Sequence, residues 1–126
     1  MSKRKPKGES HVRVYAHEMR VPAWQTLDVD ARALLLELRA LYRPSQGNVV
    51  FLSLREAMRR LHIGQRRAQH AFAALIERGW ISIAAPGGFS RKTRHATSYR
   101  LENESTGEPN SIPRKPYMRW QPEKTR

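Results

Sequence analysis

Five polar or basic side chains crowd into one short stretch near the middle of the chain. The stretch reads LHIGQRRAQHAF over residues 61–72, and the five side chains are Gln65, Arg66, Arg67, Gln69 and His70. A solvated helix surface usually mixes both signs of charge, yet no acidic residue follows Leu61 until Glu77. Arginine and glutamine are the side chains that pair bidentately with guanine and adenine edges, respectively. The stretch is therefore a candidate for contact with nucleic acid, against the plainer reading of an ordinary solvated helix face.

A helix is predicted between Gly64 and Gly79, because apolar residues recur there at helical spacing. These apolar residues are Ala68, Ala71, Phe72, Leu75 and Ile76. With that stripe facing a core, Gln65, Arg66, Gln69 and His70 turn outward and could read bases. Arg67 lies nearer the edge of the stripe and is expected to contact a phosphate. The backbone N–H groups at the helix N-terminus could hold another phosphate.

A second basic cluster lies in a loop between two predicted strands. The segments 80–85 and 96–101 read as strands, and the loop 86–95 joins them. Its basic residues are Arg91, Lys92, Arg94 and His95, at the expected tip of a hairpin. Over residues 61–100, seven Lys and Arg residues face one acid, so this part supplies +6 of the formal net charge of +13. Such a tip would contact the DNA backbone or the minor groove beside the bases that the helix reads.

Earlier segments complete the expected fold. Asp28 is a predicted N-cap of a helix that ends by Pro44, and residues 49–51 form a short β-rich segment. Ser53 and Glu56 have the spacing of a capping box that opens a helix over 53–61, where Arg55 is a further candidate phosphate ligand. Residues 11–15 alternate as a short strand would. The order predicts an α+β, mostly α, winged helix-turn-helix with three helices and a β-hairpin wing.

The two ends of the chain differ in composition from the middle. Residues 1–10 are expected to be a disordered basic tail whose cations are Lys3, Arg4, Lys5 and Lys7. Such an arm can enter a minor groove, although more often it adds only nonspecific affinity. The folded domain is expected over 11–102, followed by a Pro-rich extension over 103–126 without regular elements.

Aromatic residues raise a separate question. Trp24 and Trp80 flank predicted elements and are expected in the core. Tyr117, Met118 and Trp120 lie in the extension, which is too short to bury them by itself. The sequence leaves open whether they fold back, join a homodimer or contact a protein partner.

Enzymatic chemistry has little support in the sequence. The chain has 126 residues and no cysteine, and its five histidines lack metal-ligand spacing. Asp28 and Asp30 stand where helix capping explains them, and PGGFS lacks the lysine pattern of a phosphate loop. We therefore expect no catalysis, no metal and no cofactor. No apolar run is long enough to span a membrane, so a cytoplasmic protein with a polyanionic partner is expected.

Several stretches resemble small winged helix-turn-helix proteins associated with phages and plasmids of proteobacteria. They are AWQTLDVDARALLLELRALY, LSLREAMRRLHIGQRRAQHAFAALIERGWI, GGFSRKTRHATSYRL and YMRW, within about residues 20–120. The resemblance implies DNA binding. Gly64 and Arg67 depart from the Ser and Thr common in such proteins, so their base preference is not carried over.

Together these patterns predict a sequence-specific protein that binds double-stranded DNA and regulates transcription of a mobile element. A homodimer is expected, because two half-sites multiply specificity. Two other DNA roles stay open, a replication-initiation module and a DNA-bending excision factor. A fourth reading, of another class, is a protein-interaction adaptor on the same scaffold. RNA binding is disfavoured, because the exposed helix face lacks an aromatic stacking platform.

Overall fold

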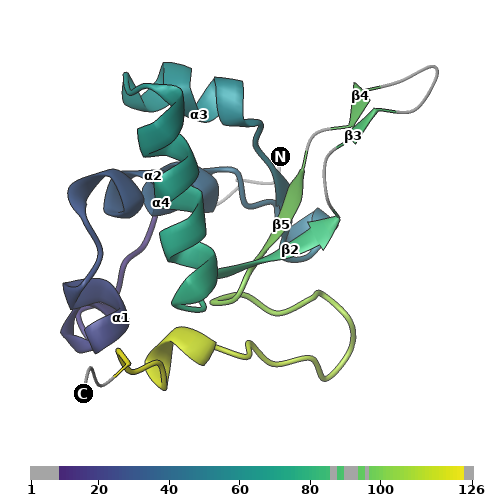
Figure 1. The fold of residues 1–126 in the computed structure, drawn as a ribbon. Helices are drawn as coiled ribbons and strands as arrows, with labels where there is room; N and C mark the ends of the chain where they lie inside the picture. Colours follow the sequence, from purple (N-terminus) through teal and green to yellow (C-terminus); the bar gives the residue numbers. More distant parts are fainter. Residues whose placement is uncertain (1–8, 86–87, 90–93, 96, 124–126) are drawn as a thin grey trace.

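The computed structural model describes residues 9–85, 88–89, 94–95 and 97–123. These residues form a mostly helical α+β fold (Figure 1). Its helices are α1 (Pro22–Gln25), α2 (Val29–Ala40), α3 (Leu54–Leu61) and α4 (Gln65–Glu77). Short 3-10 helices are η1 (Glu18–Arg20), η2 (Pro44–Gln46) and η3 (Pro116–Met118). Its strands are β1 (Val49–Phe51), β2 (Ile81–Ala85), β3 (Gly88–Phe89), β4 (Arg94–His95) and β5 (Ser98–Leu101).

Helix starts follow the predicted caps. Asp28 Oδ1 accepts a hydrogen bond from Ala31 N at 2.8 Å and opens α2. Ser53 Oγ accepts from Glu56 N at 3.0 Å and opens α3. Each bond satisfies one backbone donor that the first turn would leave without an intrahelical partner. These two predicted caps are confirmed.

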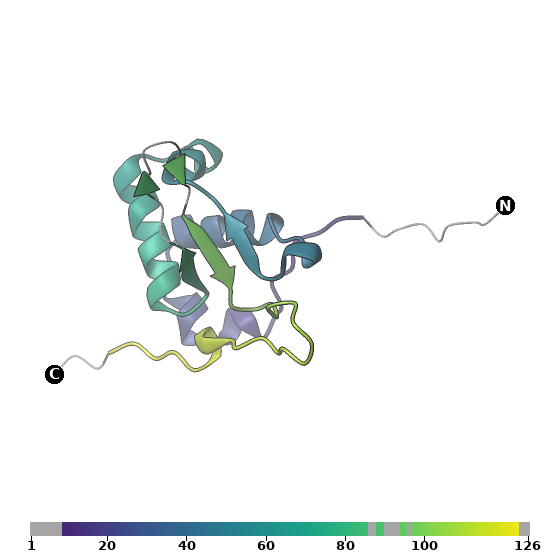
Figure 2. The same cartoon turned by 90° about the vertical axis from the view of Figure 1, so that its right-hand side faces the viewer.

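The sheet has three antiparallel strands in the order β1-β5-β2. Val50 of β1 and Ile83 of β2 both lie opposite Tyr99 of β5, which occupies the centre. The helices pack on one side of this sheet (Figures 1 and 2). Beyond β2 and β5, the short strands β3 and β4 pair Gly88 with His95 and extend the same hairpin. The predicted loop 86–95 therefore contains a short ladder of its own.

One core holds the helices, the sheet and the C-terminal segment together. Leu34, Leu38, Leu75 and Leu101 are fully buried at its centre. Trp80 lies among them with its Nε1–H donating to Ala23 O at 3.1 Å, and Trp24 meets its ring edge-on at 5.9 Å between centroids. Burying such rings is a dominant stabilising contribution to a small core. The expectation that both tryptophans belong to the core is confirmed.

The C-terminal segment folds back across the end of α4 (Figure 1). Tyr117 is fully buried, and its ring stacks on Trp80 at 4.1 Å with an interplanar angle of 10°. Trp120 is partly buried and lies beneath the guanidinium of Arg78, 4.9 Å from the ring centroid. The prediction that no regular element follows Glu102 is wrong at η3, which places Tyr117 in the core.

One further prediction is wrong. Residues 11–15 are not a strand, because side chains take up their backbone groups. Arg39 Nη1 donates to Arg13 O at 2.8 Å, and Tyr15 N donates to Glu18 Oε1 at 2.8 Å. Residues 1–8 of the expected tail 1–10 lie outside the described residues. Within the described part of the chain, no helix is long and apolar enough to cross a membrane.

The left-handed residue of the turn between α3 and α4 is His62, at φ 55° and ψ 46°. Gly64, in the same turn, has φ −77° and is the N-cap residue of α4. A left-handed conformation costs a non-glycine residue about 1–2 kcal/mol, which the surrounding helices must offset.

Candidate nucleic-acid interface

The α3–turn–α4 unit presents the residues singled out in the sequence. On α4, Ala68, Ala71, Phe72 and Leu75 are buried. Successive side chains turn by about 100° around a helix, so the intervening positions must face away from that core. The outward residues are Gln65, Arg66, Arg67, Gln69, His70 and Ala73, and all are exposed. The predicted exposure of the candidate base-reading residues is thus what the structure shows.

Three of these side chains make no polar contact with other described residues. Within the described residues, no hydrogen bond or ion pair engages the side chain of Gln65, Arg66 or Gln69. Their amide and guanidinium groups therefore have their full donor and acceptor capacity available to a ligand.

Arg67 differs from its neighbours. Its Nε donates to Asp30 Oδ2 at 2.8 Å and its Nη2 to Asp30 Oδ1 at 2.7 Å, which makes a bidentate ion pair between α4 and α2. The hydrogen bonds from Arg67 hold the pKa of Asp30 below its usual value. The sequence suggested a capping role for Asp30 and a phosphate contact for Arg67. In the structure, the two residues join the start of α2 to α4, and nothing in a pair 37 positions apart signals this in the sequence.

His70 also faces an acid. Its Nε2 lies 3.8 Å from Asp28 Oδ2, and both side chains are about half exposed or more. At that distance the pair is a weak electrostatic contact rather than a hydrogen bond. Thus one edge of the α4 surface has the carboxylates of Asp28 and Asp30 beside it, whereas no carboxylate pairs with Arg66 within the described residues.

The N-terminus of α4 lacks a side-chain cap, since Gly64 supplies none. The first N–H groups of a helix have no intrahelical acceptor, and the helix dipole adds partial positive charge there. Arg66 stands beside them in the first turn. This arrangement favours an anionic group.

Helix α3 contributes further basic side chains. Arg55 is exposed in its first turn. Arg59 and Arg60 both donate to the carboxylate of Glu56, Arg60 Nε at 3.1 Å, and their hydrogen bonds lower the pKa of Glu56 to about 2. Together α3 and α4 hold five arginines and two glutamates, in the segments LREAMRRL and QRRAQHAFAALIE.

The remaining candidates lie partly or wholly outside the described structure. The backbone of Arg94 and His95 forms β4, and nothing is described for their side chains. Arg91 and Lys92 of the predicted wing lie outside the described residues, as do Lys3, Arg4, Lys5 and Lys7 of the predicted arm. Their roles remain those that the sequence predicts.

A comparison of the chain with protein-family models, curated proteins and solved structures found no match. The interpretation of the site therefore depends on its own geometry and chemistry.

Proposed function

We propose that the chain is a winged helix-turn-helix protein that binds double-stranded DNA sequence-specifically and regulates transcription of a mobile element. The main support for the proposal is the exposure of Gln65, Arg66 and Gln69 on α4. These side chains are exposed on the outer face of α4 and have no partner among the described residues, and they are of the types that recognise guanine and adenine edges. In helix-turn-helix proteins the N-terminal residues of the second helix contact bases in the major groove.

The topology supports the winged-helix assignment. β1 lies between α2 and α3 in the chain and adds to the β2–β5 hairpin that follows α4. A winged helix uses this order, with its hairpin as the wing. In this proposal, Gln65, Arg66, Gln69 and His70 read bases.

Phosphates are assigned to groups around these residues. Arg55 on α3 and the uncapped N-terminus of α4 suit one strand of the backbone. The basic tip with Arg91, Lys92, Arg94 and His95 suits the backbone beside the groove, and the N-terminal arm adds charge. Because each neutralised phosphate releases counterions, affinity should fall steeply as salt rises. The reference to a mobile element, and to a bacterial cytoplasm, rests on the resemblance described above.

The test is selection from a pool of random duplexes at about 150 mM salt, followed by sequencing of the bound fraction. An enriched motif supports the proposal, and palindromic half-sites would indicate a homodimer. Arg66→Ala should relax the preference at one base pair, at a cost of about 1–3 kcal/mol. Arg114→Ala is the matched control, because it removes one exposed arginine from the C-terminal segment.

Other results would redirect the assignment. Equal losses on specific and random DNA from Arg66→Ala would count against base reading. Direct repeats would favour a replication-initiation module, and binding without enrichment but with bending would favour an excision factor. Absence of binding would leave the protein-interaction adaptor. For that reading, Met118 and Trp120 are the accessible contact candidates, since Tyr117 is fully buried.

A further inference from the structure

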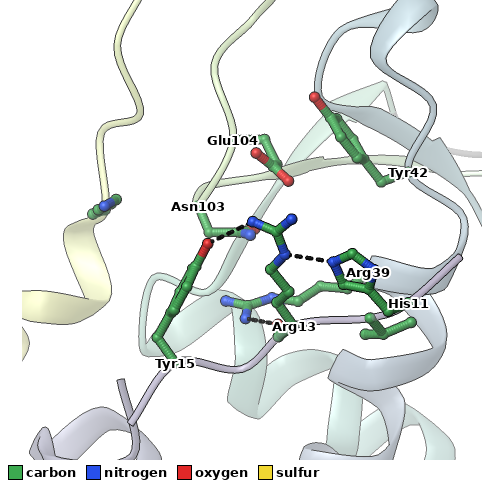
Figure 3. A pocket seen from close by; sticks show the side chains of 9 residues that line it. His11, Arg13, Tyr15, Arg39, Tyr42, Asn103 and Glu104 are labelled. Carbon is green, nitrogen blue, oxygen red and sulfur yellow. Dashed lines mark hydrogen bonds between the residues drawn. The ribbon is translucent and has the colours of Figure 1, made fainter. Parts of the chain in front are cut away.

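A polar pocket of about 420 Å³ lies away from α3 and α4, between the two ends of the described chain (Figure 3). Its walls come from four residues of the segment 11–15, from Arg39 near the end of α2 and Tyr42 just after it, and from Asn103, Glu104 and Lys115. The volume lies within the range of about 300–1,000 Å³ that is typical of small-molecule sites. No residue of the proposed DNA interface lines it.

The pocket contains cations that lack an anionic partner. Arg13 Nε donates to His11 Nε2 at 2.6 Å, and its Nη1 donates to the hydroxyl of Tyr15 at 3.0 Å, so its partners are uncharged. Within the described ranges, no carboxylate lies within 4 Å of a nitrogen of Arg13 or Lys115. Arg39 differs, because its guanidinium is already paired with Glu18. Arg13 and Lys115 attract the carboxylate of Glu104 only at longer range, without a hydrogen bond or ion pair among the described residues, so both keep donors for an anionic group.

Two acceptors without hydrogen-bond donors among the described residues also line the pocket. The carboxylate of Glu104 has no hydrogen bond or ion pair within the described part of the chain, and burial raises its pKa above the usual value. Beside it, the amide oxygen of Asn103 is buried and accepts no hydrogen bond from the described residues. Folded proteins rarely leave such acceptors unsatisfied. In Figure 3 the Glu104 carboxylate is seen above the Arg13 guanidinium. The ring of Tyr15 is seen to the lower left of this guanidinium and the ring of Tyr42 to its upper right.

We propose that this pocket binds a small zwitterion of the α-amino acid class. Its carboxylate is held by Arg13 and Lys115, and its ammonium group is held by Glu104. Each charged group of the ligand then meets an unpaired group of opposite sign. A purely cationic ligand would meet Arg13 and Lys115, and a purely anionic one would leave Glu104 unpaired beside a second negative charge. The tyrosine rings offer surface for the ligand side chain.

The experiment is isothermal titration calorimetry of the full chain with the free L-amino acids. Each amino acid that binds is then compared with its N-acetyl and its amide derivative. We expect saturable binding of at least one free amino acid. Either derivative should bind on the order of tenfold more weakly, because each loses one charge-assisted contact. Arg13→Gln and Glu104→Gln should have effects of similar size, whereas the matched surface variants Arg20→Gln and Glu108→Gln should bind like the original chain.

Three results would overturn the proposal. The first is absence of saturable binding for every amino acid up to about 10 mM, a concentration that would reveal even weak sites. The second is binding that survives both pocket substitutions. The third is equal binding of the N-acetyl derivative or of inorganic phosphate, which would define a simple anion site. None of these outcomes depends on DNA binding, so the two proposals fail independently.

Discussion

Arg39 and Glu18 form a buried ion pair with two hydrogen bonds. Arg39 Nη1 and Nη2 bind the two carboxylate oxygens of Glu18 at 3.0 and 2.7 Å, with the two side chains 4% and 1% exposed. The same guanidinium lies 5.6 Å from the centroid of the Trp80 ring. Burial would raise the pKa of Glu18, but the hydrogen bonds from Arg39 and from Tyr15 N outweigh it and hold the pKa below its usual value. This pair ties the segment before α1 to α2.

Arg39→Met should destabilise the fold by about 3–5 kcal/mol, because it leaves a buried carboxylate without a partner. Urea unfolding at neutral pH measures the effect. The double variant with Glu18→Gln should recover part of the loss, since it removes the uncompensated charge. Equal stability of the single and double variants would contradict this account.

The same pair fixes the sign of the pH dependence. Glu18 has a lower pKa folded than unfolded, so its contribution is complete above the unfolded pKa and is lost as pH falls through the folded pKa. In the original chain, stability should therefore decline on acidification below about pH 4.3, the ordinary glutamate pKa. In Glu18→Gln that decline should be shallower.

Under the DNA-binding proposal, Asp30 competes with phosphate for the guanidinium of Arg67. Asp30→Asn should free Arg67 for a phosphate, strengthen binding to random duplex and steepen the log-affinity against log-salt slope by about 0.9. Fluorescence anisotropy at several salt concentrations measures both. Glu77→Gln is the control, because it also removes one carboxylate paired with an arginine, here Arg78 just after α4 at 3.0 Å. Identical slopes in the two variants would argue that Arg67 does not reach a phosphate.

At the scale of elements, the end of α4 is fixed by Gly79. Its φ is 84°, Gly79 N donates to Ile76 O at 3.2 Å, and Trp80 N donates to Leu75 O at 3.0 Å. These are the two hydrogen bonds of a Schellman motif. The missing Cβ also makes room for the C-terminal segment, since a Cβ there would lie 3.0 Å from Pro116 and from Tyr117 N.

Gly79→Ala should cost at least about 1–2 kcal/mol from the left-handed conformation alone. The close approach to Pro116 and Tyr117 should add to this loss. Thermal unfolding followed by circular dichroism measures it. Gly64→Ser is the companion variant, because a Cβ there meets nothing within 4 Å. A serine cap on α4 should leave stability unchanged or raise it by a few tenths of a kcal/mol; similar losses in both variants would contradict the explanation.

Local signals account for the elements that the sequence predicted. Apolar spacing and the caps Asp28 and Ser53 act within a few residues, so α2, α3 and α4 could be read directly. The predicted strand over residues 11–15 was wrong because Arg39 and Glu18 bind backbone groups that a paired strand would use. On the site, periodicity was enough to predict the exposed face of α4. It could not show the Arg67–Asp30 pair, which depends on how α2 and α4 pack.

For the molecule as a whole, the Pro-rich segment completes the fold. The sequence left three roles open for Tyr117, and its burial against Trp80 follows from long-range packing that no local pattern encodes. Tyr117→Ala should cost about 3–5 kcal/mol, by analogy with other large buried aromatic side chains. Tyr117→Phe should change stability by less than about 1 kcal/mol, because the buried hydroxyl lies near the Glu18–Arg39 pair and interacts with it electrostatically, but it meets no hydrogen-bond geometry among the described residues. Urea unfolding of both variants tests this, and a large loss in Tyr117→Phe would reveal a hydroxyl interaction.

The stacking of Tyr117 on Trp80 also gives the protein an optical signal. Trp80 is fully buried, Trp24 is nearly so, and Trp120 is partly buried. If the C-terminal segment leaves while the helices stay folded, the Trp80 indole gains contact with water, and its emission should shift to longer wavelength before the helical circular dichroism changes. In a chain that keeps Trp80 alone, intrinsic fluorescence would then report detachment of that segment without any attached dye.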